Sequence, residues 1–261
     1  MRKIERIDFA NWIPKKVLLT ILVFLIISLA MAFGVKHFLN SKILMTIFLF
    51  IALVILVLEL YMLYCYRAFS FNGGKVMRKI HKYVLSFTPD DMEGRIIDIG
   101  CGSGAISIEL AKKYTKASII GIDYWGANWD YSLKQCIDNA RIANLDIEFK
   151  RGDAAKLEFV DESFDMAISN FVFHEVKTVD NKEDLIIEAL RVVKNGGFFI
   201  FHDLFESKSF YNNINSLIER LEDEGISEIH YIPNTEDKIE LPPLIKSPFM
   251  LNNLGLIYGR K

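Results

Sequence analysis

Few of the residues that build metal and disulfide sites are present in this chain. It has three cysteines and five histidines among 261 residues. Cys65, Cys101 and Cys136 have neither the spacing of metal ligands nor that of a disulfide framework. The sequence therefore predicts no metal site, and it predicts that Cys101 is a small packing residue rather than a nucleophile.

Charged residues are missing from long stretches near the N-terminus. Val17 to Val35 is an uncharged run of 19 residues, and a second run from Ile43 to Tyr66 is interrupted only by Glu59. Each could cross about 30 Å of hydrocarbon as a helix that rises 1.5 Å per residue. The short connector predicts a transmembrane hairpin with helices at about 17–35 and 43–66. A cleaved signal peptide is the alternative for the first run, but its apolar region is typically only about 7–15 residues long.

Basic residues set the expected orientation of this hairpin. Five lysines and arginines precede the first run, two lie in the connector and five follow the second run. Because Lys and Arg gather on the cytoplasmic side of membrane proteins, we expect attachment to the cell membrane with both termini and the catalytic domain in the cytoplasm. Glu59 follows roughly 24 Å of helix counted from Ile43, so we expect it near the far interface.

The two parts of the chain differ in charge. Residues 1–82 contain 12 Lys and Arg against 3 Asp and Glu, whereas the remainder contains 19 against 30. The basic part suits an anionic membrane surface, and the acidic part lacks the basic footprint of a nucleic-acid-binding domain. We therefore expect the membrane and a small-molecule or lipid acceptor as partners, and no nucleic acid.

The segment Ile96 to Gly104 carries the strongest functional signal. An apolar, β-branched run typical of a buried parallel strand ends in three alternating glycines, and helical apolar spacing begins at Ala105. A strand, a glycine turn and a helix N-terminus present unpaired N–H groups to a ligand, and glycine lets the backbone approach that ligand closely. The sequence predicts a cofactor-binding turn here.

Two kinds of cofactor fit such a turn. Dinucleotide-binding folds need G-x-G-x-x-G/A, which Gly100, Gly102 and Ala105 satisfy loosely. The alternative is S-adenosylmethionine, which has an amino acid and a sulfonium in place of a pyrophosphate. A carboxylate two residues before the first glycine suits the ammonium group and would repel a pyrophosphate. Asp98 occupies that position, so the turn favours S-adenosylmethionine over a nicotinamide dinucleotide.

Further motifs follow the glycine turn in order. They are an acid at the tip of a second strand, a G-D-A step after a third, a fourth strand, and a helix, turn and fifth strand: Asp123, Gly152 to Ala154, Ser163 to Asn170 and Leu190 to Ile200. Together they resemble class I S-adenosylmethionine-dependent methyltransferases, closely from Gly94 to Asp203 and loosely at the last strand. The resemblance implies an α/β, doubly wound, seven-stranded, mostly parallel sheet with an antiparallel last strand, here preceded by the two-helix transmembrane hairpin.

The resemblance also implies a role for individual residues. With S-adenosylmethionine as cofactor, the glycine turn would take its amino-acid part, Asp123 its ribose and Asp153 its adenine amino group. The expected cofactor-binding residues are Asp98, Gly100, Cys101, Gly102, Gly104, Asp123, Tyr124, Asp153, Ala154 and Asn170.

Catalytic residues are expected just after the fourth strand, which lines the methyl-donating end of the pocket in this family. His174 has the ordinary pKa of a general base near neutral pH, and Glu175 lies beside it. These two form the expected catalytic pair, and His202 with Asp203 forms a second candidate. A purely structural role for either pair is the alternative.

Beyond Leu204 the chain is specific to this protein. The pattern predicts a helix from Phe210 to Glu224, a sixth strand from Glu228 to Pro233 and an irregular insert from Asn234 to Asn253. The acceptor pocket of related methyltransferases usually draws on such segments.

We therefore expect three parts: a membrane hairpin at 1–71, a hinge and lid helix at 72–92, and an S-adenosylmethionine-dependent methyltransferase domain at 93–261. The helix predicted from Val76 to Phe87 would cover the cofactor site, as in related methyltransferases. The expected activity is transfer of a methyl group to a small or hydrophobic, lipidic acceptor by a membrane-anchored enzyme. The alternatives are an NAD(P)-dependent oxidoreductase that uses the same turn, and a catalytically silent, membrane-tethered binding module.

Overall fold

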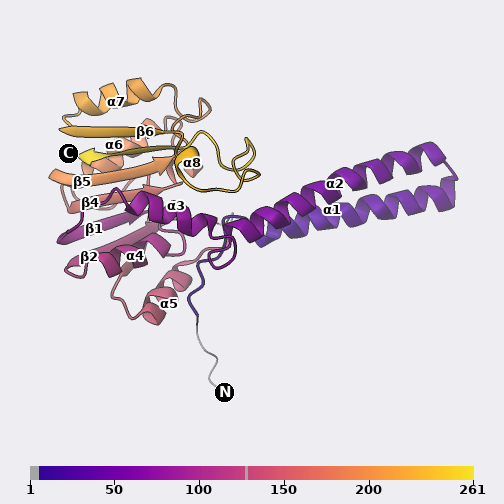
Figure 1. The fold of residues 1–261 in the computed structure, drawn as a ribbon, viewed down its shortest axis with the longest axis horizontal. Coiled ribbons are helices and arrows are strands. Elements are labelled where there is room, and N and C mark those ends of the chain that lie inside the picture. Colours follow the sequence, from indigo (N-terminus) through magenta and orange to yellow (C-terminus); the bar gives the residue numbers. More distant parts are fainter. Residues whose placement is uncertain (1–5, 127–128) are drawn as a thin grey trace, which may run out of the picture. The chain divides into compact units, whose positions relative to one another are not determined.

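The computed structural model describes residues 6–126 and 129–261, which fall into two compact units (Figure 1). The hairpin unit contains residues 10–77 and residues 129–130, and the sheet unit contains residues 6–9, 78–126 and 131–261. The described chain thus starts in the sheet unit, leaves it for the hairpin and returns. The expected division at residues 71 and 92 does not include this return of the first residues to the sheet unit.

Two apolar helices make up most of the hairpin unit. α1 spans Lys15–Gly34 and continues as a π-helical turn at Val35–Leu39, and α2 spans Lys42–Phe69. Both are long and apolar enough to cross a membrane. Most of their large apolar side chains are exposed, as in Phe33 and Phe50. The predicted helix pair is present. The residues before position 6 that count toward its expected orientation lie outside the described part of the chain.

Hydrogen bonds between the two arms of the hairpin fix their register. Ser28 Oγ donates to the main-chain oxygen of Phe48 at 2.9 Å, and Asn11 Nδ2 donates to that of Tyr66 at 2.8 Å. These bonds place Glu59 opposite the first turns of α1, near the end at which the chain enters and leaves the hairpin. Glu59 is 7% exposed and packs inside the hairpin.

The sheet unit is built on seven strands in the order β3-β2-β1-β4-β5-β7-β6. The strands are β1 Gly94–Ile99, β2 Ala117–Asp123, β3 Glu148–Arg151, β4 Phe164–Asn170, β5 Val193–Asp203, β6 Glu228–Pro233 and β7 Gly255–Arg260. Strands β1 to β5 pair in parallel, and β7 runs antiparallel to both β5 and β6. The expected fold class is confirmed.

Helices cover both faces of this sheet. They are α3 Val76–Leu85, α4 Ala105–Lys113, α5 Leu133–Ala143, α6 Glu183–Arg191, α7 Ile214–Asp223 and the short α8 Thr235–Lys238, with a 3₁₀ turn at Phe173–Glu175. The crossovers through α4 and α6 run in opposite directions along the sheet, so right-handed connections put these helices on opposite faces (Figure 1). Ile80 and Val84 of α3 are fully buried, as its predicted apolar face requires.

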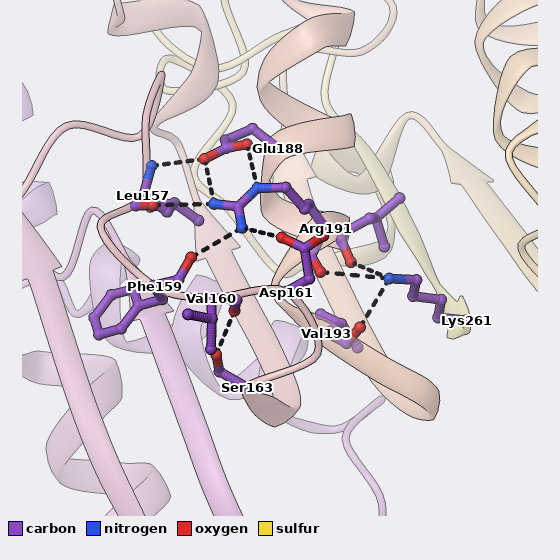
Figure 2. Close-up of polar contacts among 10 residues, drawn as sticks. Leu157, Phe159, Val160, Asp161, Ser163, Glu188, Arg191, Val193 and Lys261 are labelled. Carbon is purple, nitrogen blue, oxygen red and sulfur yellow. Dashed lines mark hydrogen bonds and ion pairs between the residues drawn. The ribbon is translucent and has the colours of Figure 1, made fainter.

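Two side chains of α6 hold the connection between β3 and β4. Arg191 donates to the main-chain oxygens of Leu157 and Phe159 at 3.0 and 2.9 Å, and to the carboxylates of Glu188 and Asp161 (Figure 2). Glu188 in turn accepts a hydrogen bond from the N–H of Leu157 at 2.7 Å. Because this connection carries the expected adenine-side residues at its start, α6 helps to fix that edge of the site.

The variant Arg191→Lys keeps the charge but loses the planar guanidinium that reaches several acceptors at once. We expect the free energy of unfolding to fall by about 1–3 kcal/mol, because buried carbonyl groups lose their donor. Thermal unfolding of the full chain in detergent, followed by tryptophan fluorescence, measures the change. Lys116→Ala breaks an exposed pair with Glu93 and should leave the unfolding midpoint almost unchanged. Equal midpoints for both variants would contradict this role of Arg191.

Candidate cofactor-binding and active site

The candidate site lies where the strand order reverses, between β1 and β4. In open α/β sheets, ligands bind at the carboxyl ends of the strands at such a point. β1 ends in the glycine turn and β4 ends at Asn170, while Asp123 is the last residue of β2 and Asp153 follows β3. The structure thus brings the residues expected to bind the cofactor to one edge of the sheet.

The turn after β1 has a geometry that requires glycine. Gly100, Gly102 and Gly104 have φ angles of 73, 57 and 78°, in a region that other L-residues rarely adopt. A Cβ atom at Gly100 would also lie 2.1 Å from Cγ2 of Val172, the second residue after β4. The turn is therefore packed directly against the segment that follows β4.

Side chains engage both backbone polar groups of Gly102. Its N–H donates to Asp123 Oδ2 at 2.9 Å, and its carbonyl oxygen accepts from Trp125 Nε1 at 2.8 Å and from Cys136 Sγ at 3.1 Å. Trp125, with a φ of 45°, also donates its backbone N–H to Asp123 Oδ1 at 2.7 Å. Cys101 is buried beside these residues, and burial raises the pKa of its thiol, which suits a packing residue.

Asp123 combines this structural role with capacity for a ligand. Burial raises its pKa, and hydrogen bonds from backbone N–H groups oppose that rise. A carboxylate has about four lone-pair positions, so acceptor capacity remains for the hydroxyl groups of a ribose. Next to it, Tyr124 is 60% exposed, and the guanidinium of Arg151 lies 5.0 Å from the centre of its ring. The loop after β2 therefore offers both a carboxylate and an aromatic surface.

Asp98 lies beneath the turn, where it is 1% exposed. Its carboxylate accepts a hydrogen bond from Ser107 Oγ at 2.5 Å, and burial raises its pKa to about 7. Because Ser107 is in the first turn of α4, this bond ties the end of β1 to the N-terminus of the helix. The sequence suggested a direct partner for an ammonium group. The bond to α4 was not foreseen because Ser107 belongs to no motif.

Two more of the expected residues lie across the site from each other. Asp153 Oδ1 accepts a hydrogen bond from the N–H of Ala155 at 2.9 Å, and Ala154 is buried. Asn170, at the end of β4, is paired through Oδ1 with Nδ1 of His202 at 2.8 Å. Both Asp153 and Asn170 are only partly buried and follow their strands at the expected places.

His202 is part of a short buried chain of hydrogen bonds. Its Nε2 lies 2.8 Å from Thr235 Oγ1, and burial lowers its pKa to about 3, so the ring is neutral. Because an amide oxygen can only accept, the proton lies on Nδ1, and Asn170 directs its NH₂ group away from His202. Thr235 lies in the insert that the sequence left irregular.

His174, of the expected catalytic pair, forms an ion pair with Asp203, of the second candidate pair. Its Nδ1 lies 2.5 Å from Asp203 Oδ1, and its backbone N–H donates to Asp203 Oδ2 at 3.2 Å. Burial lowers the pKa of His174, but Asp203 and then Glu175 outweigh burial and raise it to about 10. The ring is therefore an imidazolium at neutral pH, unlike the base with an ordinary pKa that the sequence suggested. Glu175, 3.5 Å from Nε2 and partly exposed, is the carboxylate left open to a ligand.

A family of proteins described as "Methyltransferase domain" matches residues 97–201, from β1 to β5. The chain is 32% identical over 126 residues to a phthiotriol/phenolphthiotriol dimycocerosates methyltransferase of Mycobacterium tuberculosis, covering 48% of this chain and 43% of that protein. It is 33% identical over 125 residues to a fatty-acid O-methyltransferase of Mycolicibacterium smegmatis, covering 48% and 42%. The chain thus matches less than half the length of these curated relatives.

A solved structure shares the fold. A phosphoethanolamine N-methyltransferase 2 of Haemonchus contortus, in complex with phosphomonomethylethanolamine and S-adenosylhomocysteine, superimposes with a TM-score of 0.55 at 17% identity, over 72% of this chain and 53% of that chain. Residues 97–201 belong to a class I S-adenosylmethionine-dependent methyltransferase domain.

S-adenosylmethionine is the cofactor of this methyltransferase domain, and the observed turn fits it. Gly100, Gly102 and Gly104 leave the turn without a Cβ atom at three of its five positions, and Asp123 keeps acceptor capacity beside it. Within residues 6–126 and 129–261, no group of three or more His, Cys, Asp or Glu residues is placed to hold a metal ion.

Asp123→Ala should weaken binding of S-adenosylmethionine by roughly ten- to a hundredfold. A hydrogen bond to a charged group contributes about 1.5–3 kcal/mol, and about 1.4 kcal/mol corresponds to a factor of ten. Titration calorimetry on the full chain in detergent measures this loss. Asp138→Ala is the matched control, because Asp138 pairs with Lys134 and Arg141 on the surface of α5. An unchanged Kd for Asp123→Ala would show that Asp123 does not bind the cofactor.

The ion pair of His174 and Asp203 should make stability depend on pH. The folded pKa of His174 is raised above its ordinary value of 6.5, so its contribution is full below about pH 6.5 and is lost as pH rises toward 10. His174→Gln should lower the free energy of unfolding by about 3–5 kcal/mol near pH 6 and by less near pH 10. Denaturant unfolding across this range tests it. A loss for His174→Gln that is constant with pH would contradict the ion pair.

Proposed function

We propose that this protein is a membrane-anchored methyltransferase that transfers a methyl group from S-adenosylmethionine to a hydrophobic, lipid-like acceptor. The observation that carries the proposal is the joining, in one chain, of the methyltransferase domain to two helices whose large apolar side chains are exposed. A pair of core helices in a water-soluble protein would bury that surface, and apolar surface of this extent marks a membrane or interaction site.

The names of two relatives support an acceptor of this class. One is described as a methyltransferase of phthiotriol and phenolphthiotriol dimycocerosates, and another as a fatty-acid O-methyltransferase. In this proposal residues 1–71 anchor the enzyme, residues 72–92 connect and residues 93–261 carry the chemistry. The basic residues before and after the hairpin support a cytoplasmic position for both termini and for the methyltransferase domain.

Bound S-adenosylmethionine would supply an electrophilic methyl group, carried on a sulfonium, for transfer to the acceptor. The contribution of the protein is positioning and the exclusion of water. In the proposal the glycine turn, Asp123 and Asp153 hold the cofactor, and Asn170 offers an N–H donor to a polar group of the cofactor or acceptor.

Glu175 and His174 are the proposed catalytic pair, with the roles that their charges allow. An acceptor hydroxyl must lose a proton as it attacks. His174 lowers the pKa of Glu175, which keeps this carboxylate deprotonated and free to accept that proton, while making it a weaker base than an ordinary glutamate. His174 already holds its proton at neutral pH and orients Glu175. A carboxylate acceptor would need no base.

Sealed membrane vesicles from cells that produce the full chain test both the acceptor and the sidedness. S-adenosylmethionine is charged and stays on the side to which it is added. Radiolabel from it should therefore enter the solvent-extractable lipid fraction in inverted vesicles, but in right-side-out vesicles only after permeabilisation. Vesicles with the Asp123→Ala variant provide the matched control and should show at least tenfold less label at limiting cofactor.

Two results would contradict the proposal. Label found only in water-soluble products would rule out a lipid-like acceptor. Binding of S-adenosylmethionine without any transfer, under conditions in which the vesicles supply their native lipids, would favour the silent binding module.

A further inference from the structure

The residues just before the hairpin form part of the sheet unit, and we call residues 6–9 the strap. The amide of Asn139 in α5 pairs with both backbone groups of Asp8: the N–H of Asp8 donates to Oδ1 at 2.9 Å, and Nδ2 donates to the carbonyl oxygen of Asp8 at 2.8 Å. Gln135 Nε2 donates to the same oxygen at 2.8 Å. Asn139 is only 2% exposed, so this is a built contact rather than a surface one.

The strap also reaches the glycine turn itself. Ser103 Oγ donates to the carbonyl oxygen of Phe9 at 2.9 Å, and the carbonyl oxygen of Ser103 accepts from Asn139 Nδ2 at 3.0 Å. Ser103 is 4% exposed and Phe9 is 9% exposed. The hydroxyl of Ser103 is therefore bound directly to the strap, and its carbonyl oxygen is linked to the strap through Asn139.

The position of Ser103 makes these bonds matter for the cofactor. It lies between Gly102 and Gly104, which both have positive φ and, lacking a Cβ atom, can adopt many other conformations. Asp123 and Trp125 hold Gly102 from one direction. Without a partner for the Ser103 hydroxyl and the Asn139 amide, both buried, the turn would have to rearrange to satisfy them.

We propose that the strap is a working part of the cofactor site: it holds the glycine turn in its binding conformation through Ser103 and Asn139. S-adenosylmethionine affinity thus depends on residues that precede the first apolar helix in the sequence. Ser103, Asn139 and Asp8 are positioning residues in this scheme, since they act through the shape of the turn. A turn that is ordered in advance binds more tightly, because less ordering remains to be done on binding.

Two substitutions in the full chain, Ser103→Ala and Asp8→Pro, test this from opposite sides of the contact. Ser103→Ala removes the hydroxyl donor to Phe9, and Asp8→Pro removes the N–H donor to Asn139. Each should weaken S-adenosylmethionine binding about three- to tenfold, as expected for the loss of one neutral hydrogen bond. Calorimetry well below the unfolding midpoint gives the Kd values. Ser118→Ala, at the opposite end of β2, removes an exposed serine hydroxyl and should leave the Kd unchanged.

A double variant separates positioning from a general loss of stability. If both substitutions release the same turn, Ser103→Ala should weaken binding less in the Asp8→Pro background than in the parent chain. Fold-changes that simply multiply would overturn the proposal. Kd values within twofold of the parent for both single variants would also overturn it, even where the unfolding midpoint falls. These outcomes concern cofactor binding alone and do not depend on which acceptor is methylated.

Discussion

The conformation of Gly102 and Ser103 is the constraint on which the cofactor site depends. Three of the five residues of this turn are glycines at positive φ, so its shape depends on contacts with neighbouring segments. Four segments supply it: the tip of β2 and the loop behind it through Asp123 and Trp125, α5 through Cys136 and Asn139, and residues 6–9. Asp98 adds a hydrogen bond beneath the turn that joins β1 to α4. The turn at residues 100–104 is thus held by contacts from segments that lie as far apart in the sequence as Phe9 and Asn139.

At the ends of β4 and β5, the charges of the side chains, rather than the backbone conformation, determine how the site is arranged. Asp203 keeps His174 protonated, and His174 lowers the pKa of Glu175, so one buried carboxylate sets the state of a second, accessible one. His202, one residue before Asp203, is neutral and fixes the orientation of Asn170. Two adjacent residues of β5 therefore control the groups that follow β4, because neighbouring parallel strands end at the same edge.

Most of the fold could be predicted from sequence because its central parallel strands β1, β2, β4 and β5 are largely apolar and buried. The glycine turn, the acids after β2 and β3, and the run Glu228–Pro233 all mark elements that the structure contains. The sequence could name His174 and Glu175 but not their charges, since these depend on Asp203 nearly thirty residues away. The contacts of residues 6–9 were not foreseeable for another reason. They run largely through backbone N–H and carbonyl groups, which every residue carries and which leave no pattern of side chains.

The return of residues 6–9 to the sheet unit has a consequence for how the protein is made. These residues leave the ribosome well before Asn139, their partner, which is synthesised 131 residues after Asp8. Both apolar helices emerge in between. The hydrogen bonds of Asn139 to Asp8 and to Ser103 can therefore form only after the whole hairpin and α5 have been synthesised. The glycine turn is thus completed well after its own residues have emerged.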